Sequence, residues 1–466
     1  MTYRQLLKGN ANFRYLWWGQ VVSEIGDWLN NIAVLALALE LAGPAHQGRA
    51  IAVYAIARHL PLFVFGPIAG VVVDRTDRRR VMIVADVVRA VLAAGFLLAQ
   101  MFSSLPAIYA VGASLFAVSA FFNAAKRATI PVIVTQTDEL LNANSLSAST
   151  TAATIAIGSA LGGLVATFIS RDLVFILNAV TFLVSALMIS RICLPPRQRV
   201  QARLPHERIA ASVVSATAPE SAIKSLEETA GGSSRGRVTT GLFRAVFEFR
   251  EGLRYVRSDG MLAAVFIVAA GWGLGNGVAR ALYSVFGARL GELTAAGWAA
   301  RPRDFGISVL FVAMGAGGVL GAPVARRFNA AGEDLGARMG RSLMLDGCGL
   351  ALFSLMPNLW TASLILIARE MNFAIWWTAQ QTLIMRRTDN AYAGRVFASY
   401  ETLTTLMMVA SMYAAGASAD AFGLRPVAAA GGLTIAFSGL LWFLLRRRQR
   451  STGAASATTD AKHLST

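Results

Sequence analysis

Four polar side chains occupy one face of the first apolar segment of the chain, residues 14–41. They are Gln20, Glu24, Asp27 and Asn31. Steps of four, three and four residues return to the same side of an α-helix, so these groups form one polar stripe. A carboxylate in the middle of a membrane-length helix costs free energy unless it faces a partner or a water-filled cavity, and such carboxylates often relay protons. Asp27, and Glu24 one turn away, are therefore candidate proton-coupling residues.

Arg58 lies near the middle of the second apolar segment, residues 51–73. It is the only basic residue this deep in the first half of the sequence, so Asp27 is its expected partner, and Arg58 joins the proton-coupling candidates. The alternative is a permanent Asp27–Arg58 pair with a purely structural role. His59 follows directly and is expected to be packed against its neighbours.

Two later segments combine charges, amides and aromatic rings near mid-membrane. Residues 359–385 carry Arg369 and Glu370, and residues 261–286 carry Arg280 on a face with further polar and aromatic groups. Such a surface suits a cavity for an amphipathic or cationic aromatic molecule. Alternatively, Arg369 and Glu370 neutralise each other while the tryptophans pack against lipid. Glu370 is a further proton-coupling candidate. The candidate cavity residues are Gln20, Asn31, Trp272, Asn276, Arg369, Phe373, Trp377 and Gln381.

The composition indicates that these segments lie in a lipid bilayer. Of the 466 residues, 55% are hydrophobic and 15% are charged, which is too apolar for a soluble chain of this length. A net charge of +17 would fit nucleic acid in a soluble protein, but here the arginines fall between apolar segments, as in cytoplasmic loops near anionic lipid heads. We therefore expect contact with the lipid bilayer and no nucleic-acid partner.

Other kinds of chemistry find no support in the sequence. Cys193 and Cys348 are far apart, and the four histidines lack the spacing of metal ligands. Neither an ATP-binding Gly-x-x-x-x-Gly-Lys-Ser/Thr loop nor a nucleophile–base arrangement occurs. We expect no enzyme activity, no metal and no cofactor, and an ion gradient as the source of energy.

Twelve apolar segments are long enough to cross a bilayer. They cover residues 14–41, 51–73, 81–102, 105–125, 149–170, 173–194, 261–286, 304–326, 340–357, 359–385, 397–419 and 424–445. Arg and Lys cluster in alternate connections, so the positive-inside rule places both termini in the cytoplasm. The predicted fold is all-α, with two pseudo-symmetric six-helix halves. The predicted parts are the first half (1–194), a flexible cytoplasmic linker (195–242), an amphipathic interfacial helix (243–258), the second half (259–447) and a disordered cytoplasmic tail (448–466).

The connection between the second and third segments, residues 70–80, reads Gly-Val-Val-Val-Asp-Arg-Thr-Asp-Arg-Arg-Arg. It resembles the Gly-x-x-x-Asp-Arg-x-x-Arg-Arg loop motif of the major facilitator superfamily, except that Asp77 stands where the family usually has Gly. We expect close helix packing at Gly70. The resemblance implies that this loop docks on the start of segment 397–419 when the transporter faces outward, and that one of its arginines pairs with Glu401.

Asp86 and Arg89, near the cytoplasmic end of segment 81–102, are expected to join the charge network of this loop and not to touch cargo. The candidate residues for the conformational switch are Gly70, Asp74, Arg75, Arg78, Arg79, Asp86, Arg89 and Glu401.

Five further stretches, residues 12–17, 23–28, 57–61, 85–89 and 140–144, resemble the enterobactin-exporter and macrolide-efflux branch of that superfamily. The resemblance implies a secondary-active transporter of the bacterial inner (plasma) membrane that exports a small molecule by alternating access and proton antiport. A drug, an antibiotic or a siderophore would be its substrate, and we expect a monomer. The alternatives are nutrient uptake, or a non-transporting sensor or assembly partner with the same fold.

Overall fold

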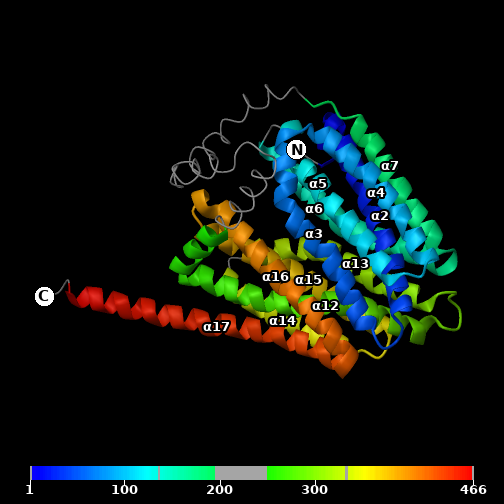
Figure 1. Cartoon of the computed structure of the whole chain (residues 1–466). Helices are drawn as coiled ribbons and strands as arrows, with labels where there is room; N and C mark the ends of the chain where they lie inside the picture. The colour runs from blue at the N-terminus through cyan, green and yellow to red at the C-terminus, as the bar shows by residue number, and fades with distance from the viewer. Residues whose placement is uncertain (1–2, 135–136, 195–248, 331–333, 464–466) are drawn as a thin grey trace, which may run out of the picture.

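The computed structural model describes residues 3–134, 137–194, 249–330 and 334–463 (Figure 1). The helices of the first half are α1 (Tyr3–Gly9), α2 (Ala11–Ala42), α3 (Gln47–Arg75), α4 (Arg78–Met101), α5 (Leu105–Ile133), α6 (Thr137–Phe168) and α7 (Arg171–Ser190). Those of the second half are α12 (Gly260–Ala295), α13 (Pro302–Ala330), α14 (Leu335–Leu355), α15 (Leu359–Arg387), α16 (Asn390–Phe422) and α17 (Leu424–His463). No strand occurs in the described ranges, so the predicted all-α fold is confirmed.

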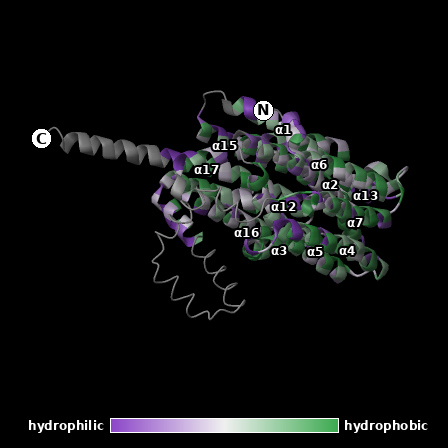
Figure 2. Cartoon of the chain, turned by 90° about the horizontal axis from the view of Figure 1, so that it is seen from above, coloured by the Kyte–Doolittle hydropathy of each residue, from purple (hydrophilic) through white to green (hydrophobic). Residues whose placement is uncertain are grey.

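Apart from α1, these helices match the twelve predicted apolar segments one by one. Nine of them are long and apolar enough to cross a membrane by length and composition. The other three are α14, α15 and α16, and α15 shows why, since Arg369 and Glu370 lie in its middle. Large apolar side chains such as Val91 (68% exposed) and Leu433 (65% exposed) are exposed, as expected for a surface that lipid would surround. Hydrophobic residues predominate along the helices in Figure 2.

Short polar side chains set the starts of many helices. Side-chain caps come from Asn10, Asp77, Ser104, Ser170, Asp259, Asp334 and Asn358. Each accepts a hydrogen bond from a backbone N–H in the first turn, which would otherwise lack a partner. Asp77, the departure from the family motif, accepts from Arg79 at 2.9 Å and from Arg80 at 3.3 Å and so starts α4.

The two halves meet at one end of the bundle and diverge toward the other (Figure 1). We call the end with the connections at residues 43–46, 102–104 and 169–170 the outer end, following the positive-inside assignment, and the end with the 76–77 connection the inner end. Helix α3 packs against α16, and α6 packs against α13. Near the outer end a Cβ on Gly48 would overlap the carbonyl oxygen of Gly416, so the backbones of α3 and α16 touch there.

Polar contacts reinforce the closure of the outer end. Arg171 of α7 donates from Nε and Nη2 to the carboxylate of Asp304 on α13, both at 2.8 Å, and from Nη1 to Glu40 of α2 at 2.6 Å. Asp420 of α16 accepts the backbone N–H of Gly48 at 2.8 Å and thereby satisfies the start of α3. These contacts tie the first half to the second.

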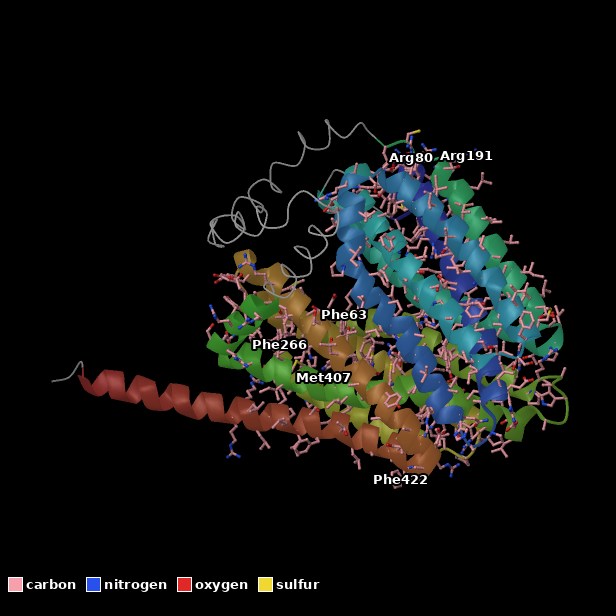
Figure 3. All side chains as sticks on the ribbon, viewed as in Figure 1. Phe63, Arg80, Arg191, Phe266, Met407 and Phe422 are labelled. Atoms are coloured by element: carbon pink, nitrogen blue, oxygen red, sulfur yellow. The ribbon has the colours of Figure 1, made fainter. Side chains whose placement is uncertain are left out.

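The inner end is open between the halves. A Cβ on Gly70 would meet no heavy atom within 4 Å, so the predicted close packing at Gly70 is wrong in this structure. Phe63 on the same helix is 37% exposed, and Figure 3 shows it between the halves. Arg80 and Arg191 lie together at the inner end of the first half, away from Phe422 at the outer end (Figure 3).

Three predicted segments lie outside the two helical halves: the linker, the interfacial helix and the C-terminal tail. The predicted linker, residues 195–242, lies outside the described residues. Part of the predicted interfacial helix, residues 249–258, is helical and packs on the start of α16, where Glu251 pairs with Arg395 at 3.0 Å. Helix α17 continues to His463, where the sequence predicts disorder, and the alanines of this stretch favour a helix.

Candidate functional site

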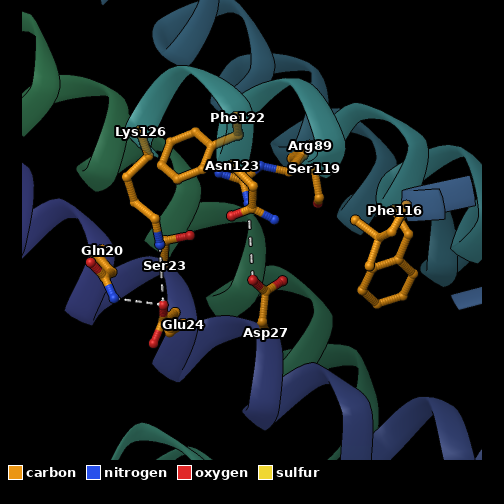
Figure 4. Close-up of a pocket in the computed structure, with 11 residues that line it drawn as sticks. Gln20, Ser23, Glu24, Asp27, Arg89, Phe116, Ser119, Phe122, Asn123 and Lys126 are labelled. Carbon is orange, nitrogen blue, oxygen red and sulfur yellow. Dashed lines mark hydrogen bonds and ion pairs between the residues drawn. The ribbon is translucent and has the colours of Figure 1, made fainter. Parts of the chain in front are cut away.

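A cavity of about 90 Å³ lies in the first half between α2, α3, α4 and α5 (Figure 4). Its lining residues are Gln20, Ser23, Glu24, Asp27, Leu62, Arg89, Phe116, Ser119, Phe122, Asn123 and Lys126. One water needs about 10–15 Å³ of such space, so the cavity has room for several waters. Ligand pockets for drug-sized molecules measure roughly 300–1,000 Å³, so it does not enclose a whole cargo. The cavity therefore suits water and proton exchange.

Glu24 is the most heavily bonded carboxylate of this cavity. Its Oε1 accepts a hydrogen bond from Gln20 at 2.8 Å and lies 3.6 Å from the ammonium of Lys126. Its Oε2 accepts from the hydroxyl of Thr154 on α6 at 3.0 Å. The predicted polar stripe of α2 thus forms. Through the contacts of Glu24 it connects α2 with α5 and α6.

Asp27 faces the same cavity with fewer partners. Its carboxylate lies 4.0 Å from Arg89, and 26% of its side chain is exposed. Arg89 is itself held by a hydrogen bond to the buried Asp86, and its guanidinium carbon lies 4.1 Å from the ring centre of Phe122 and 4.4 Å from that of Phe182. Arg89 therefore has three partners besides Asp27.

Asp86 and Arg89 were expected near the inner surface, in the charge network of the loop. Instead they are buried, with 0% and 2% exposure, and Arg89 lines the cavity. The reason is geometric, because α4 begins at Arg78, so these residues lie about 12–16 Å along the helix at 1.5 Å per residue.

Arg58 does not form the predicted pair with Asp27. It donates a hydrogen bond to Oδ1 of Asn31, and its guanidinium carbon lies 4.9 Å from the ring centre of Trp28 and 5.0 Å from that of Phe116. The Arg58 side chain thus packs against residues of α2 and α5, whereas Asp27 lies beside Arg89. His59 is packed, with Nδ1 2.8 Å from the carbonyl oxygen of Ala55.

A second charged cluster lies in the other half, around Arg369. Its Nε lies 3.1 Å from Oδ1 of Asp346, and its Nη2 donates to Oδ2 at 3.1 Å. Arg369 also donates to the hydroxyl of Tyr283, while Glu370 and Asn276 lie 3.5 Å away. Glu370 therefore contributes to the neutralisation of Arg369, but Asp346 is the main counter-charge.

The predicted aromatic cavity residues of the second half form a stack. Trp272 lies 4.6 Å from Trp376 and 5.8 Å from Phe373 between ring centres, and Phe373 lies 5.9 Å from Trp377. Trp272 is buried by these rings, while Trp377 is 36% exposed. Gln381 makes no hydrogen bond with the part of the chain that the structure describes.

The loop candidates bind their own half. Arg78 donates to a backbone carbonyl of α5 at 2.8 Å, and Arg79 donates to a carbonyl at the end of α7. Asp74 and Arg75 are exposed at the end of α3. Glu401 is exposed, and its carboxylate makes no hydrogen bond or ion pair with any described residue. The pair between an arginine and Glu401 is absent here, and for an outward-facing state it stays a prediction.

Two residues of these clusters escaped the sequence analysis. Lys126 follows the apolar segment 105–125 and resembles a loop residue, but α5 continues to Ile133 and carries it into the cavity. Asp346 is a carboxylate within segment 340–357, and the argument that selected Asp27 would have selected it as well.

Comparison with known proteins points to one family. The family model described as Major Facilitator Superfamily matches residues 16–412. BacE of Bacillus subtilis (strain 168), named as a bacilysin exporter, is 34% identical over 182 residues, which cover 39% of this chain and 44% of BacE. Macrolide efflux protein A of Streptococcus pyogenes is 33% identical over 125 residues, which cover 26% of this chain and 30% of that protein. The matches thus span less than half of either relative.

Solved structures agree with this fold. A crystal structure of a mutant of the nucleoside transporter NupG is similar with a TM-score of 0.65 at 11% sequence identity, over 92% of this chain and 99% of NupG. At this identity the likeness concerns the fold alone.

Proposed function

The chain belongs to the Major Facilitator Superfamily and is a multi-pass membrane transporter, and from this premise we propose that it exports a small amphipathic molecule in exchange for protons. The names of the two relatives support export, since one is named as a bacilysin exporter and the other as a macrolide efflux protein. The main support for proton exchange is that Asp27 lines the cavity of the first half.

Asp27 can gain and lose a proton without leaving a buried charge unpaired. When Asp27 is protonated, Arg89 keeps its hydrogen bond to Asp86 and its two aromatic neighbours. The cavity has room for water through which a proton would reach the carboxylate. A buried cation that lost its only partner would cost several kcal/mol, and this arrangement avoids that cost.

Glu24 is less suited to the same role. Protonation of Glu24 would remove the ionised partner of Lys126, whose side chain is only 15% exposed. It would also disturb the hydrogen bonds from Gln20 and Thr154. We therefore assign proton exchange to Asp27 and a positioning role to Glu24.

The open inner end fits the loading step of an exporter. With Asp27 ionised beside Arg89, the protein has released its proton toward the inner side and can accept cargo there. Conversion to the outward-facing state requires separation of Arg171 from Asp304 and docking of the 70–80 loop near Glu401. Uptake of a proton from outside would then return the carrier.

The test uses inside-out membrane vesicles with an acidic lumen and a pH-sensitive dye. Antibiotics and siderophores are added in turn, and we expect one of them to dissipate the pH gradient in vesicles that contain the wild-type protein. The same compound should have no effect with Asp27→Asn, because an amide cannot carry the proton. Glu292→Gln is the matched control, since this carboxylate pairs with Arg303 at the outer end, away from the cavity.

The outcomes separate the assignments. Cargo-dependent dissipation that persists in Asp27→Asn would contradict proton exchange at Asp27. Cargo movement without any change of the gradient would contradict proton antiport. A complete lack of response with both compound classes would favour uptake or a non-transporting role of the same fold.

A further inference from the structure

Two arginines from opposite halves come together near the middle of the membrane. Arg58 lies near the middle of α3 (Gln47–Arg75), and Arg280 lies near the middle of α12 (Gly260–Ala295). Helices α3 and α12 pack against each other, and the two guanidinium groups lie within electrostatic range of one another. Like charges within this range repel each other.

The positive charge of Arg58 is surrounded by neutral groups. Its hydrogen-bond acceptor is the amide oxygen of Asn31, and the rings of Trp28 and Phe116 flank its guanidinium. Asp27 lies within electrostatic range, but its ion pair is with Arg89. The aromatic rings hold Arg58 in place without neutralising it.

Arg280 is also without a counter-ion in contact. It is exposed although it lies in the middle of α12, and it makes no hydrogen bond or ion pair with the residues that the structure describes. Glu370 lies within electrostatic range, yet this carboxylate contacts Arg369 at 3.5 Å. Arg280 therefore has hydrogen-bond donors that no described side chain satisfies, within electrostatic range of Arg58 on the opposite half.

We propose that Arg58 and Arg280 form a binding site for an anionic group of the transported molecule, a carboxylate or a phosphate. Each guanidinium offers donors in a planar fork that matches the oxygens of such a group. An anion between the two guanidinium groups would attract both Arg58 and Arg280 and so outweigh their mutual repulsion. Because the two arginines belong to different halves, the bound anion would favour approach of the halves around the cargo. The proposal rests on the transport function above and specifies the chemistry of its substrate.

The depth of the site favours soluble cargo over a lipid headgroup. Both arginines lie near the midpoints of their helices, whereas headgroups lie at the membrane surfaces. The incompletely buried rings of Phe373 and Trp377, which stack over the buried Trp272 in the second half, supply an apolar surface for the rest of the molecule. The predicted substrate is therefore an amphipathic acid.

The test compares matched probes on the purified full-length protein by calorimetric titration. The probes are naphthalene-2-carboxylate, its neutral carboxamide and 2-naphthyl phosphate. We expect at least one anion to bind about tenfold more tightly than the carboxamide, since charge-assisted hydrogen bonds are stronger than neutral ones. Arg280→Gln and Arg58→Gln should each remove this preference, and Arg280→Lys should keep part of it. Arg289→Gln, an exposed arginine on the same helix, is the control.

Stability distinguishes a binding role from a structural one. Without ligand, Arg280→Gln should melt at the same temperature as the wild type or higher, because repulsion is relieved. A lower melting temperature, equal binding of anion and carboxamide, no anion binding at millimolar concentration, or a preference that survives both glutamine variants would each overturn the proposal. This titration needs no proton gradient, so its failure is distinguishable from failure of the vesicle assay.

Discussion

The charged clusters of the two halves contain the same chemical groups, yet one is loosely paired and the other is closed. In the first half, Asp27 lies 4.0 Å from Arg89 and keeps 26% of its side chain exposed. In the second half, both oxygens of Asp346 lie 3.1 Å from nitrogens of Arg369, and the two side chains are 2% and 3% exposed.

This difference separates a group that can exchange a proton from a group that holds the fold. A carboxylate beside water, at the limit of ion-pair distance, changes charge at small cost. A carboxylate that is buried against a guanidinium cannot be neutralised without leaving a buried cation. We therefore place the coupling chemistry in the first half and assign the Arg369 cluster to the stability of the second.

The largest effect should follow the loss of charge at Asp346. Asp346→Asn keeps the shape of the side chain but leaves Arg369 with only Glu370, at 3.5 Å, as a charged partner. We expect a destabilisation of about 3–5 kcal/mol, because breaking a buried ion pair strands a charge. Thermal unfolding of the purified protein measures it.

The double variant Asp346→Leu with Arg369→Met provides the control. Removing both charges should recover most of the lost stability, as apolar replacement of buried ion pairs often does. Equal stability of Asp346→Asn and wild type would show that the second cluster is as exchangeable as the first.

The next effect compares two carboxylates of the same cavity. Glu24→Gln should destabilise the protein by about 1–3 kcal/mol, because Lys126 loses its ionised partner and two hydrogen bonds are weakened. Asp27→Asn should change stability by less than about 1 kcal/mol, since Arg89 retains Asp86. Unfolding midpoints in the same detergent measure both.

The order of these two variants is decisive for the assignment of the proton site. If Asp27→Asn is the more destabilising, Asp27 is a structural partner of Arg89 and Glu24 becomes the better exchange site. Ser23→Ala, on the same helix and in the same cavity, controls for changes in the lining that leave the charges untouched.

The sequence predicts the elements of this site better than their partners. Gln20, Glu24 and Asp27 share one face because helix geometry is local, and this prediction holds in the structure. The partner of Asp27 depends on how α2, α3 and α4 are rotated against each other, which residue spacing within one helix does not determine. The sequence singled out Arg58 as the buried base and assigned Arg89 to the loop, whereas in the structure Arg89 lies 4.0 Å from Asp27.

Depth was the second quantity that the sequence left open. The expected segment 105–125 ended before Lys126 because a lysine normally marks the membrane surface, yet α5 continues to Ile133. The compensating carboxylate, Glu24, is on another helix, so no local pattern signals that Lys126 is buried.

The smallest expected effect is at an exposed Asp–Arg pair. It tests whether burial of the pair, and not the pairing of Asp with Arg itself, determines how much stability is lost when the charge is removed. Asp334, at the start of α14, pairs with Arg446 of α17, but 44% of its side chain is exposed. Partial burial raises the pKa of Asp334, but the hydrogen bond and charge of Arg446, with the backbone N–H groups of Ala337 and Gly336, outweigh this and bring the pKa below its ordinary value of 3.8.

Asp334→Asn retains the helix cap and removes only the charge, so we expect a loss of less than about 1 kcal/mol. Because the native pKa is depressed, this contribution is fully present well above pH 3.8 and disappears as the pH falls through the native value. Melting temperatures of wild type and Asp334→Asn should therefore differ slightly at neutral pH and converge in acid. Arg446→Gln should show the same convergence, whereas a gap that widens in acid would mean that the Asp334 charge is unfavourable and that the pair does not stabilise α14 against α17.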